Sequence, residues 1–188
     1  MNNQTKILSV ALELFAQHGY DAVGVQRIVA AAEVTKPTLY HYFGSKKGLL
    51  LALLESRFSD LFQLLEEATA IDGNLQERLS RVVSAYFDFA GKNPEFYRLQ
   101  LSLWFAPAHS EAFDAALGFS LRQQEFLEKV FVAATGQNKK MEGQHQAYAA
   151  TFLGMTNTYI GIALNGYAEL NQSLIDRTVH QFLYGIFQ

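Results

Sequence analysis

The chain has 188 residues, of which 49% are hydrophobic and 18% are charged, and this composition supports a buried globular core. Its 3 prolines and 13 glycines are too few for a β-sandwich or barrel, which needs turn residues about every 8–12 positions. The absence of cysteine excludes disulfides, thiol catalysis and thiolate zinc sites, and is compatible with a reducing cytoplasm.

Charge is distributed unevenly along the chain. The overall net charge of −3 argues against a nucleic-acid partner, because phosphates attract Lys and Arg. The first fifty residues, however, hold five cationic and three anionic side chains, a net charge of +2. This asymmetry predicts two parts with different surfaces, one of which can approach an anion.

The N-terminus does not have the features of a secretion signal. Residues Met1 to Gln4 lack a basic region, and Glu13 interrupts the apolar stretch that follows. Residues 143–168 carry no charge and are long enough to span a bilayer, but they contain many amide and hydroxyl side chains. We therefore expect a cytoplasmic protein without a membrane span.

Apolar residues at helical spacing predict three short helices in the first 45 residues. The first covers residues 5–18 and stops at Gly19, and the second begins at Val25. A third helix covers about residues 36–42, where Thr35 offers an N-cap hydroxyl and Pro37 lies in the first turn.

Six longer helices are predicted in the remainder of the chain. Their expected ranges are about 46–70, 75–91, 94–105, 110–134, 144–167 and 173–187. Ser45, Ser110 and Ser173 are positioned to cap the first, fourth and sixth of them. No strand or repeat is evident, so the predicted fold is an all-α protein with nine helices.

Residues 25–43 have the spacing of a DNA-binding helix-turn-helix, with a turn at residues 33–35. Ile28, Ala32, Val34 and Leu39 are expected to pack inward, so that the N-terminal end of the second helix projects into the major groove. There the hydroxyls of Thr35 and Thr38 can bond phosphate oxygens. Lys36 can donate to guanine O6 and N7.

The sequence TKPTLYHYF at residues 35–43, followed by Ser45 and Lys46, resembles the TetR family of bacterial transcriptional repressors. The resemblance covers about residues 5–54 and includes ALELFAQHGYD at residues 11–21. It implies a three-helix helix-turn-helix DNA-binding domain over residues 1–46. It also implies a helical ligand-binding and dimerisation domain over residues 47–188.

The resemblance also assigns contacts to double-stranded DNA. It implies base-edge contacts by Gln26, Lys36, Pro37 and Tyr40, of which Pro37 and Tyr40 touch thymine methyl groups. It implies phosphate contacts by Thr35, Thr38, His41, Tyr42 and Lys46, with Arg27 as a further cation. Phe43 is expected in the core, as this position is buried in the family.

Two positions depart from the family's pattern. Gly24 stands where a Ser or Thr usually caps the second helix, a loss of only a few tenths of a kcal/mol. Glu33 stands where the turn usually holds Gly, and a positive φ there would cost about 1 kcal/mol or more.

A stripe of small residues in the predicted helix 144–167 indicates a close approach to another helix. Ala147, Gly154 and Gly161 recur every seven residues, and the last helix offers an apolar face made of Ile175, Val179, Phe182 and Ile186. Two copies of this helix pair would form a four-helix bundle in a homodimer, as the resemblance also implies. An intrachain core is the alternative.

Aromatic residues crowd residues 75–167, which favours a pocket for a small, largely apolar or aromatic effector. The expected lining is Phe89, Tyr97, Arg98, Trp104, Phe126, Asn157, Thr158 and Tyr159. By resemblance the protein is a ligand-responsive repressor acting on a pseudo-palindromic operator, with helix 46–70 as the lever. The alternative is a helix-turn-helix protein controlled by a protein partner, without a small-molecule sensor.

Enzyme chemistry is not expected. The five histidines are scattered, and the sequence has no Ser elbow, no glycine-rich phosphate loop and no carboxylate cluster. No metal and no cofactor are predicted.

Overall fold

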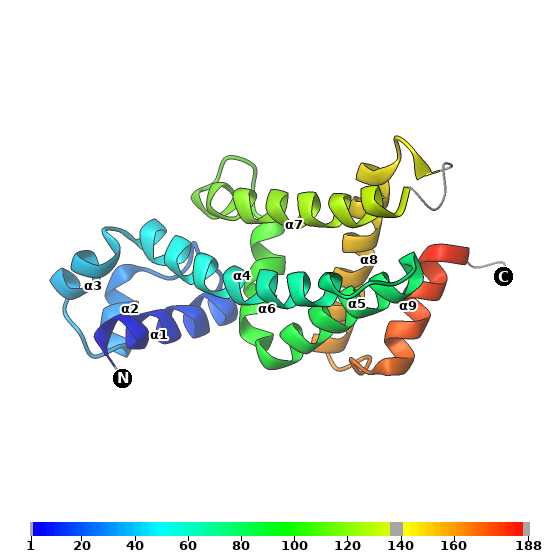
Figure 1. Cartoon of the computed structure of the whole chain (residues 1–188). Helices are drawn as coiled ribbons and strands as arrows, with labels where there is room; N and C mark the ends of the chain where they lie inside the picture. The colour runs from blue at the N-terminus through cyan, green and yellow to red at the C-terminus, as the bar shows by residue number, and fades with distance from the viewer. Residues whose placement is uncertain (1, 136–140, 186–188) are drawn as a thin grey trace. The chain divides into compact units, whose positions relative to one another are not determined.

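The structure is a computed structural model that describes residues 2–135 and 141–185. Within these residues the chain is built of helices without strands, which confirms the all-α prediction (Figure 1). The helices are α1 (Asn3–His18), α2 (Val25–Ala31), α3 (Lys36–Phe43), α4 (Lys46–Ala70), α5 (Leu75–Lys92), α6 (Pro94–Trp104), α7 (Glu111–Thr135), α8 (His145–Leu164) and α9 (Gln172–Tyr184).

Three of the four predicted serine and threonine caps are confirmed. Thr35, Ser45 and Ser110 each accept a hydrogen bond from the backbone N–H three residues on, at 3.3, 2.9 and 3.2 Å. The prediction for Ser173 is wrong. The side-chain oxygen of Asn171 accepts the equivalent bond from the Leu174 N–H at 3.1 Å. Asn171 is therefore the N-cap, and α9 begins at Gln172, one residue earlier than expected.

Helices α8 and α9 each end three residues before their predicted ends. Hydrophobic periodicity continues beyond both ends, but Gly166 and Gly185 adopt φ values of 81° and 77°, which stop a right-handed helix. The last residues of the predicted ninth helix, 186 and 187, lie outside the described residues.

Contacts divide the chain into two compact units. Unit 1 holds the chain up to Ser59 together with Pro94–Phe119, and unit 2 holds Asp60–Asn93 together with the chain from Ser120. Helices α4 and α7 therefore each contribute residues to both units. The division at residues 46 and 47 expected from the sequence is a division by function and stays a prediction.

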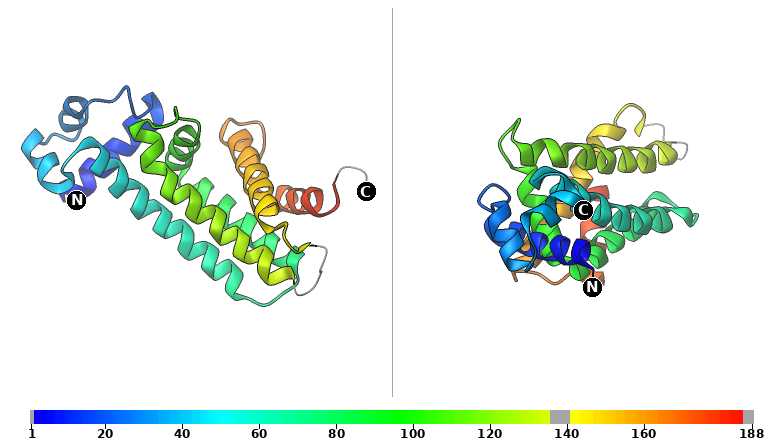
Figure 2. Two further views of the ribbon diagram at one scale, coloured as in Figure 1. Left: turned by 90° about the horizontal axis from the view of Figure 1, so that it is seen from above. Right: turned by 90° about the vertical axis from the view of Figure 1, so that its left-hand side faces the viewer.

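In unit 1, α1 packs against α6, α2 and α3, and the three N-terminal helices gather at the start of α4 (Figures 1 and 2). Helix α1 buries Ile7, Ala11 and Phe15 completely. Farther along, the Phe58 ring packs edge-on against Phe96 and stacks on Phe119, with ring centroids 5.4 and 4.8 Å apart.

In unit 2, α5 packs against α9 and α8. Four aromatic rings, those of Phe131, Tyr148, Phe152 and Phe182, form a cluster with centroids 5.0–6.5 Å apart. The fully buried Tyr86 hydroxyl donates to the amide oxygen of Gln123 at 3.3 Å, and burial raises the pKa of this phenol.

Gly48 fixes the junction between α3 and α4, and its replacement should destabilise the protein. A Cβ at this position would overlap the backbone carbonyl oxygen of Phe43, so the junction would have to shift. We expect Gly48→Ala to lower the free energy of unfolding by about 1–3 kcal/mol, measured by denaturant unfolding. The matched control is Gly118→Ala, because a Cβ on that helical glycine meets open space. Its stability should rise by about 0.5–1 kcal/mol, and equal stabilities of the two variants would contradict the prediction.

Candidate nucleic-acid interface

The helix-turn-helix is held by an apolar seam between α2 and α3. Ile28, Ala32 and Leu39 are fully buried, as predicted, while Val34 in the turn is half-buried. Phe43 at the end of α3 is also buried, in agreement with its expected place in the core. Since this side of α3 faces inward, the other side of the helix is free to meet a ligand.

The outward side of the helix-turn-helix carries the predicted DNA contacts. Exposed residues there are Gln26, Arg27, Thr35, Lys36, Pro37, Tyr40, His41 and Tyr42, and Thr38 is half-exposed. Two of the aromatic rings stand out, because Tyr40 is 47% exposed and Tyr42 is 41% exposed. All ten predicted contact residues lie in unit 1.

The N-terminal end of α3 concentrates hydrogen-bonding groups. The hydroxyls of Thr35 and Thr38 lie 2.9 Å apart, and Thr35 also accepts from the Thr38 N–H. The first amides of a helix carry a partial positive charge that favours a phosphate oxygen. Lys36, the first residue of α3, adds a full positive charge at the same end.

Two of the predicted cationic contacts are bonded within unit 1. A terminal nitrogen of Arg27 lies 2.7 Å from Nε2 of His18, and a guanidinium only donates, so this ring nitrogen accepts. Lys46 donates to the backbone oxygen of Tyr20 at 2.8 Å and lies 4.0 Å from the centre of its ring. A phosphate contact by Lys46 stays a prediction, and it would require this half-buried side chain to exchange partners.

The backbone of the turn between α2 and α3 is strained at Glu33, the position where the family's pattern usually has glycine. Glu33 adopts φ = 50°, a left-handed conformation that a residue with a Cβ takes at a cost. The Lys6 ammonium lies 2.6 Å from the Glu33 carboxylate, and this hydrogen bond and charge lower the pKa of Glu33. Gly24 caps α2 without a side-chain hydrogen bond, as expected for glycine.

The eight residues predicted to line an effector pocket are divided between the units. Tyr97, Arg98 and Trp104 belong to unit 1, whereas Phe89, Phe126, Asn157, Thr158 and Tyr159 belong to unit 2. Tyr97 and Phe89 are buried in the cores, and Trp104 is 49% exposed. Thr158 donates to a backbone oxygen of its own helix, and Tyr159 donates to Gln181 at 2.7 Å.

A groove on unit 2 has a volume of about 780 Å³, a size typical of small-molecule sites. Its described lining is uncharged and consists of Leu75, Phe131, Met141, Tyr148, Thr151, Met155, Gln181, Phe182, Leu183 and Gly185. None of these residues is among the eight predicted for the pocket. The groove forms where α5, α7, α8 and α9 meet, and the aromatic crowding of the sequence does not specify this packing.

The predicted dimer residues fall into two groups. Ile175 and Val179 are 6% and 1% exposed, because the apolar face of α9 packs mainly on α5 of the same chain, and the expectation that they face a second copy is corrected. Ala147 and Gly154 are exposed on α8, and Gly161 is half-exposed. Phe182 is half-buried in the aromatic cluster of unit 2, and Ile186 lies outside the described residues.

A lipid bilayer could not be crossed by any helix in the described part of the chain, since none is both long and apolar enough.

Comparison with known proteins places the helix-turn-helix in a family context. Residues 7–53 match the sequence profile described as bacterial regulatory proteins, tetR family. The transcriptional activator FasR of Mycolicibacterium smegmatis is 36% identical over 94 residues, which cover 50% of this chain and 43% of the relative. The regulator QacR of Staphylococcus aureus is 34% identical over 105 residues, covering 52% and 55%. The matched region thus spans about half the length of these curated relatives.

The fold extends the likeness to nearly the whole chain. The crystal structure of the regulator FadR from Bacillus subtilis in complex with stearoyl-CoA superposes with a TM-score of 0.83, covering 97% of this chain and 98% of that one. Sequence identity over this superposition is 20%, so the similarity is one of fold.

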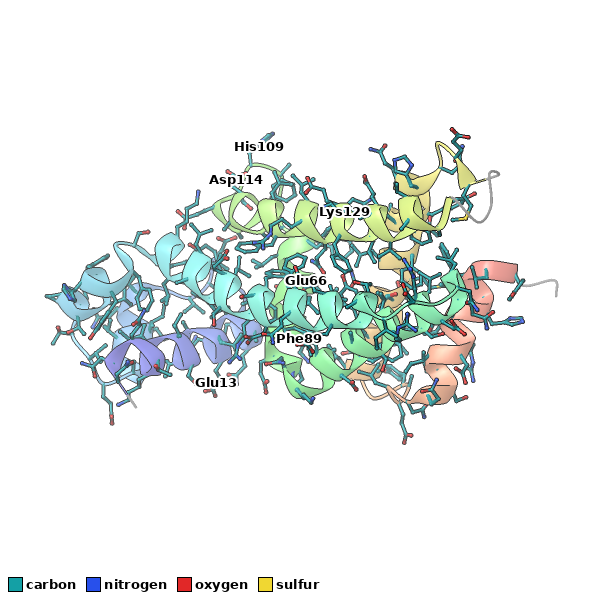
Figure 3. The ribbon with its side chains drawn as sticks, in the orientation of Figure 1. Glu13, Glu66, Phe89, His109, Asp114 and Lys129 are labelled. Atoms are coloured by element: carbon teal, nitrogen blue, oxygen red, sulfur yellow. The ribbon has the colours of Figure 1, made fainter. Side chains whose placement is uncertain are left out.

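The Lys6–Glu33 pair should make the stability of the protein depend on pH. The pKa of Glu33 is lower in the folded chain than in the unfolded chain, so its contribution is present above the unfolded pKa, about 4.3, and is lost as pH falls through the folded pKa. We expect Glu33→Gln to lose less stability than the parent protein between about pH 6 and pH 3, measured by thermal unfolding. The control is Glu13→Gln on the surface of α1, because Glu13 pairs with the neutral amide of Gln17 (Figure 3). An identical pH dependence of the parent protein and Glu33→Gln would contradict the prediction.

Proposed function

Because residues 7–53 match the TetR family of bacterial regulatory proteins, we propose that the chain is a ligand-responsive regulator of transcription that binds a pseudo-palindromic operator as a homodimer. The observation that carries this proposal is the surface of α3. A buried seam of Ile28, Ala32 and Leu39 holds this helix in place, and its other side exposes Lys36, Pro37 and Tyr40. An exposed aromatic ring beside an exposed cation suits base edges in the major groove.

Base readout and backbone contact are divided between different residues of this surface. Gln26, Lys36, Pro37 and Tyr40 read base edges, and Thr35, Thr38, His41, Tyr42, Arg27 and Lys46 bind phosphates. The net charge of the first fifty residues is only +2, so helix-end amides and hydroxyls supply a large share of the affinity.

Dimerisation proceeds through the exposed side of α8. Residues 143–168 carry no charged side chain, although α8 exposes Ala147, Thr151, Gly154 and Thr158. Loss of charge from an exposed helix face is typical of the centre of a protein interface. Two helix-turn-helix units in one dimer would contact half-sites about 34–36 Å apart on the DNA.

The groove on unit 2 is the proposed effector site. Its uncharged aromatic and methionine lining suits a small, largely apolar or aromatic compound. Matches in Bacillus subtilis support a ligand with an apolar chain: a sequence match is named a fatty acid metabolism regulator, and the FadR structure contains stearoyl-CoA, in which an apolar stearoyl chain is joined to a charged CoA group. The groove also favours a small-molecule effector over control by a protein partner alone.

Regulation is a shift between two populations of the dimer. An effector that prefers a state unsuited to the operator lowers DNA affinity by the difference in its binding to the two states, typically about 1–3 kcal/mol. Helix α4 begins next to the reading helix and contributes residues to both units, so it can carry this change. We propose that the protein represses transcription, since a bound dimer blocks the DNA that it occupies. We also propose that it acts in the cytoplasm.

Replacing Lys36 tests the reading surface. The purified protein first selects its operator from a pool of random DNA duplexes. Lys36→Ala should then weaken operator binding by about 1–3 kcal/mol and relax the preference at one base pair, measured by fluorescence anisotropy. The control is Lys129→Ala, an exposed lysine of α7 in unit 2 (Figure 3). Failure of the parent protein to select any duplex would overturn the proposed function, and sequence preference retained in Lys36→Ala would overturn the role of this residue.

Replacing Gly154 tests the dimer surface. A Cβ at Gly154 meets open space within a single chain, as it does at Gly118 on α7. Gly154→Leu should raise the dissociation constant of the dimer about tenfold or more, because added volume in a close helix contact costs about 1–3 kcal/mol. Gly118→Leu should leave that constant unchanged. Sedimentation over a range of concentrations measures both, and equal constants would show that α8 is not the interface.

A further inference from the structure

Tyr20 joins three segments of unit 1 that are far apart in sequence. Its hydroxyl donates to a carboxylate oxygen of Glu111, the first residue of α7. Its backbone oxygen accepts from Lys46 at the start of α4, at 2.8 Å. The centroids of the Tyr20 and Phe15 rings are 5.1 Å apart, so the Tyr20 ring packs in the core of the N-terminal helices. Tyr20 itself lies in the turn between α1 and α2 and is 4% exposed.

The contact with Glu111 is a hydrogen bond, which constrains the positions of both side chains more closely than apolar packing does. A buried phenol needs a hydrogen-bond partner, and a carboxylate is a stronger acceptor than a neutral oxygen. The connection that leads into α7 ends with His109 at φ = 64°, followed by Ser110, which caps the helix (Figure 3). The first turn of α7 is therefore held by its own cap and by a side-chain bond to the turn that precedes the helix-turn-helix.

We propose that Tyr20 and Glu111 form a positioning pair that holds the helix-turn-helix in the orientation required for operator binding. The inference rests on the proposed function, since it concerns DNA affinity. Helix α7 reaches from Glu111 to Phe131, which lines the effector groove, so movement of this helix acts on Tyr20 through one hydrogen bond.

The test compares specific with non-specific DNA affinity in a set of variants. Tyr20→Phe removes the hydroxyl and keeps the ring, and Glu111→Ala removes the acceptor. Each should lower the ratio of operator affinity to scrambled-duplex affinity at least about fivefold, and the double variant should be no worse than Glu111→Ala alone. Glu111→Gln keeps an acceptor oxygen and should restore most of the ratio. A purely structural contact would lower the unfolding temperature and leave the ratio unchanged.

Asp114→Ala is the matched control. Asp114 lies in the same acidic first turn of α7, and no hydrogen bond joins it to Tyr20 in the described residues (Figure 3). An effect of this variant equal to that of Glu111→Ala would assign the loss to the charge at the helix end and overturn the proposal. Unchanged ratios in Tyr20→Phe and Glu111→Ala would also overturn it. A parent protein that selects no duplex would instead overturn the proposed function, and the positioning role with it.

Discussion

The position of α3, and of the side that it exposes, depends on the burial of one face of α1. Ile7, Ala11 and Phe15 lie on that face and are fully buried, and α1 contacts α2, α3 and α6. Because α3 has only eight residues, it is too short to be stable alone and takes its position from this packing. The outward direction of Lys36 and Tyr40 is thus a consequence of apolar contacts made on the opposite side of the helices.

Much of this arrangement could be predicted from the sequence because the signals are local. Hydrophobic spacing and capping residues such as Thr35 and Ser45 act within one turn of helix, and they placed most helix ends within a few residues. The predicted ends of α8 and α9 were too late, because the apolar pattern continues past the real ends. Both helices stop near a glycine with positive φ, Gly166 and Gly185. The Asn171 cap was missed because Ser173, two residues later, offers the same chemistry.

Contacts between distant segments were the part that the sequence could not provide. Ile175 and Val179 form an apolar stripe whether its partner is a second copy or α5, and only packing distinguishes these cases. In the same way, the groove on unit 2 depends on α5, α7, α8 and α9 meeting, and counting aromatic residues along the sequence does not show which of them line it. The bond between Tyr20 and Glu111 spans 91 positions and left no pattern in the sequence.

The interleaving of the two units has a consequence for how this protein can be taken apart. The chain passes from one unit to the other after Ser59, after Asn93 and after Phe119. A fragment ending near residue 46 would contain every residue assigned to DNA contact, but it would lack α6, against which α1 packs. Such a fragment would expose an apolar face that the whole chain buries. The three N-terminal helices therefore do not form an independent domain. Exchanging them between relatives would require α6 and the start of α7 to be exchanged with them.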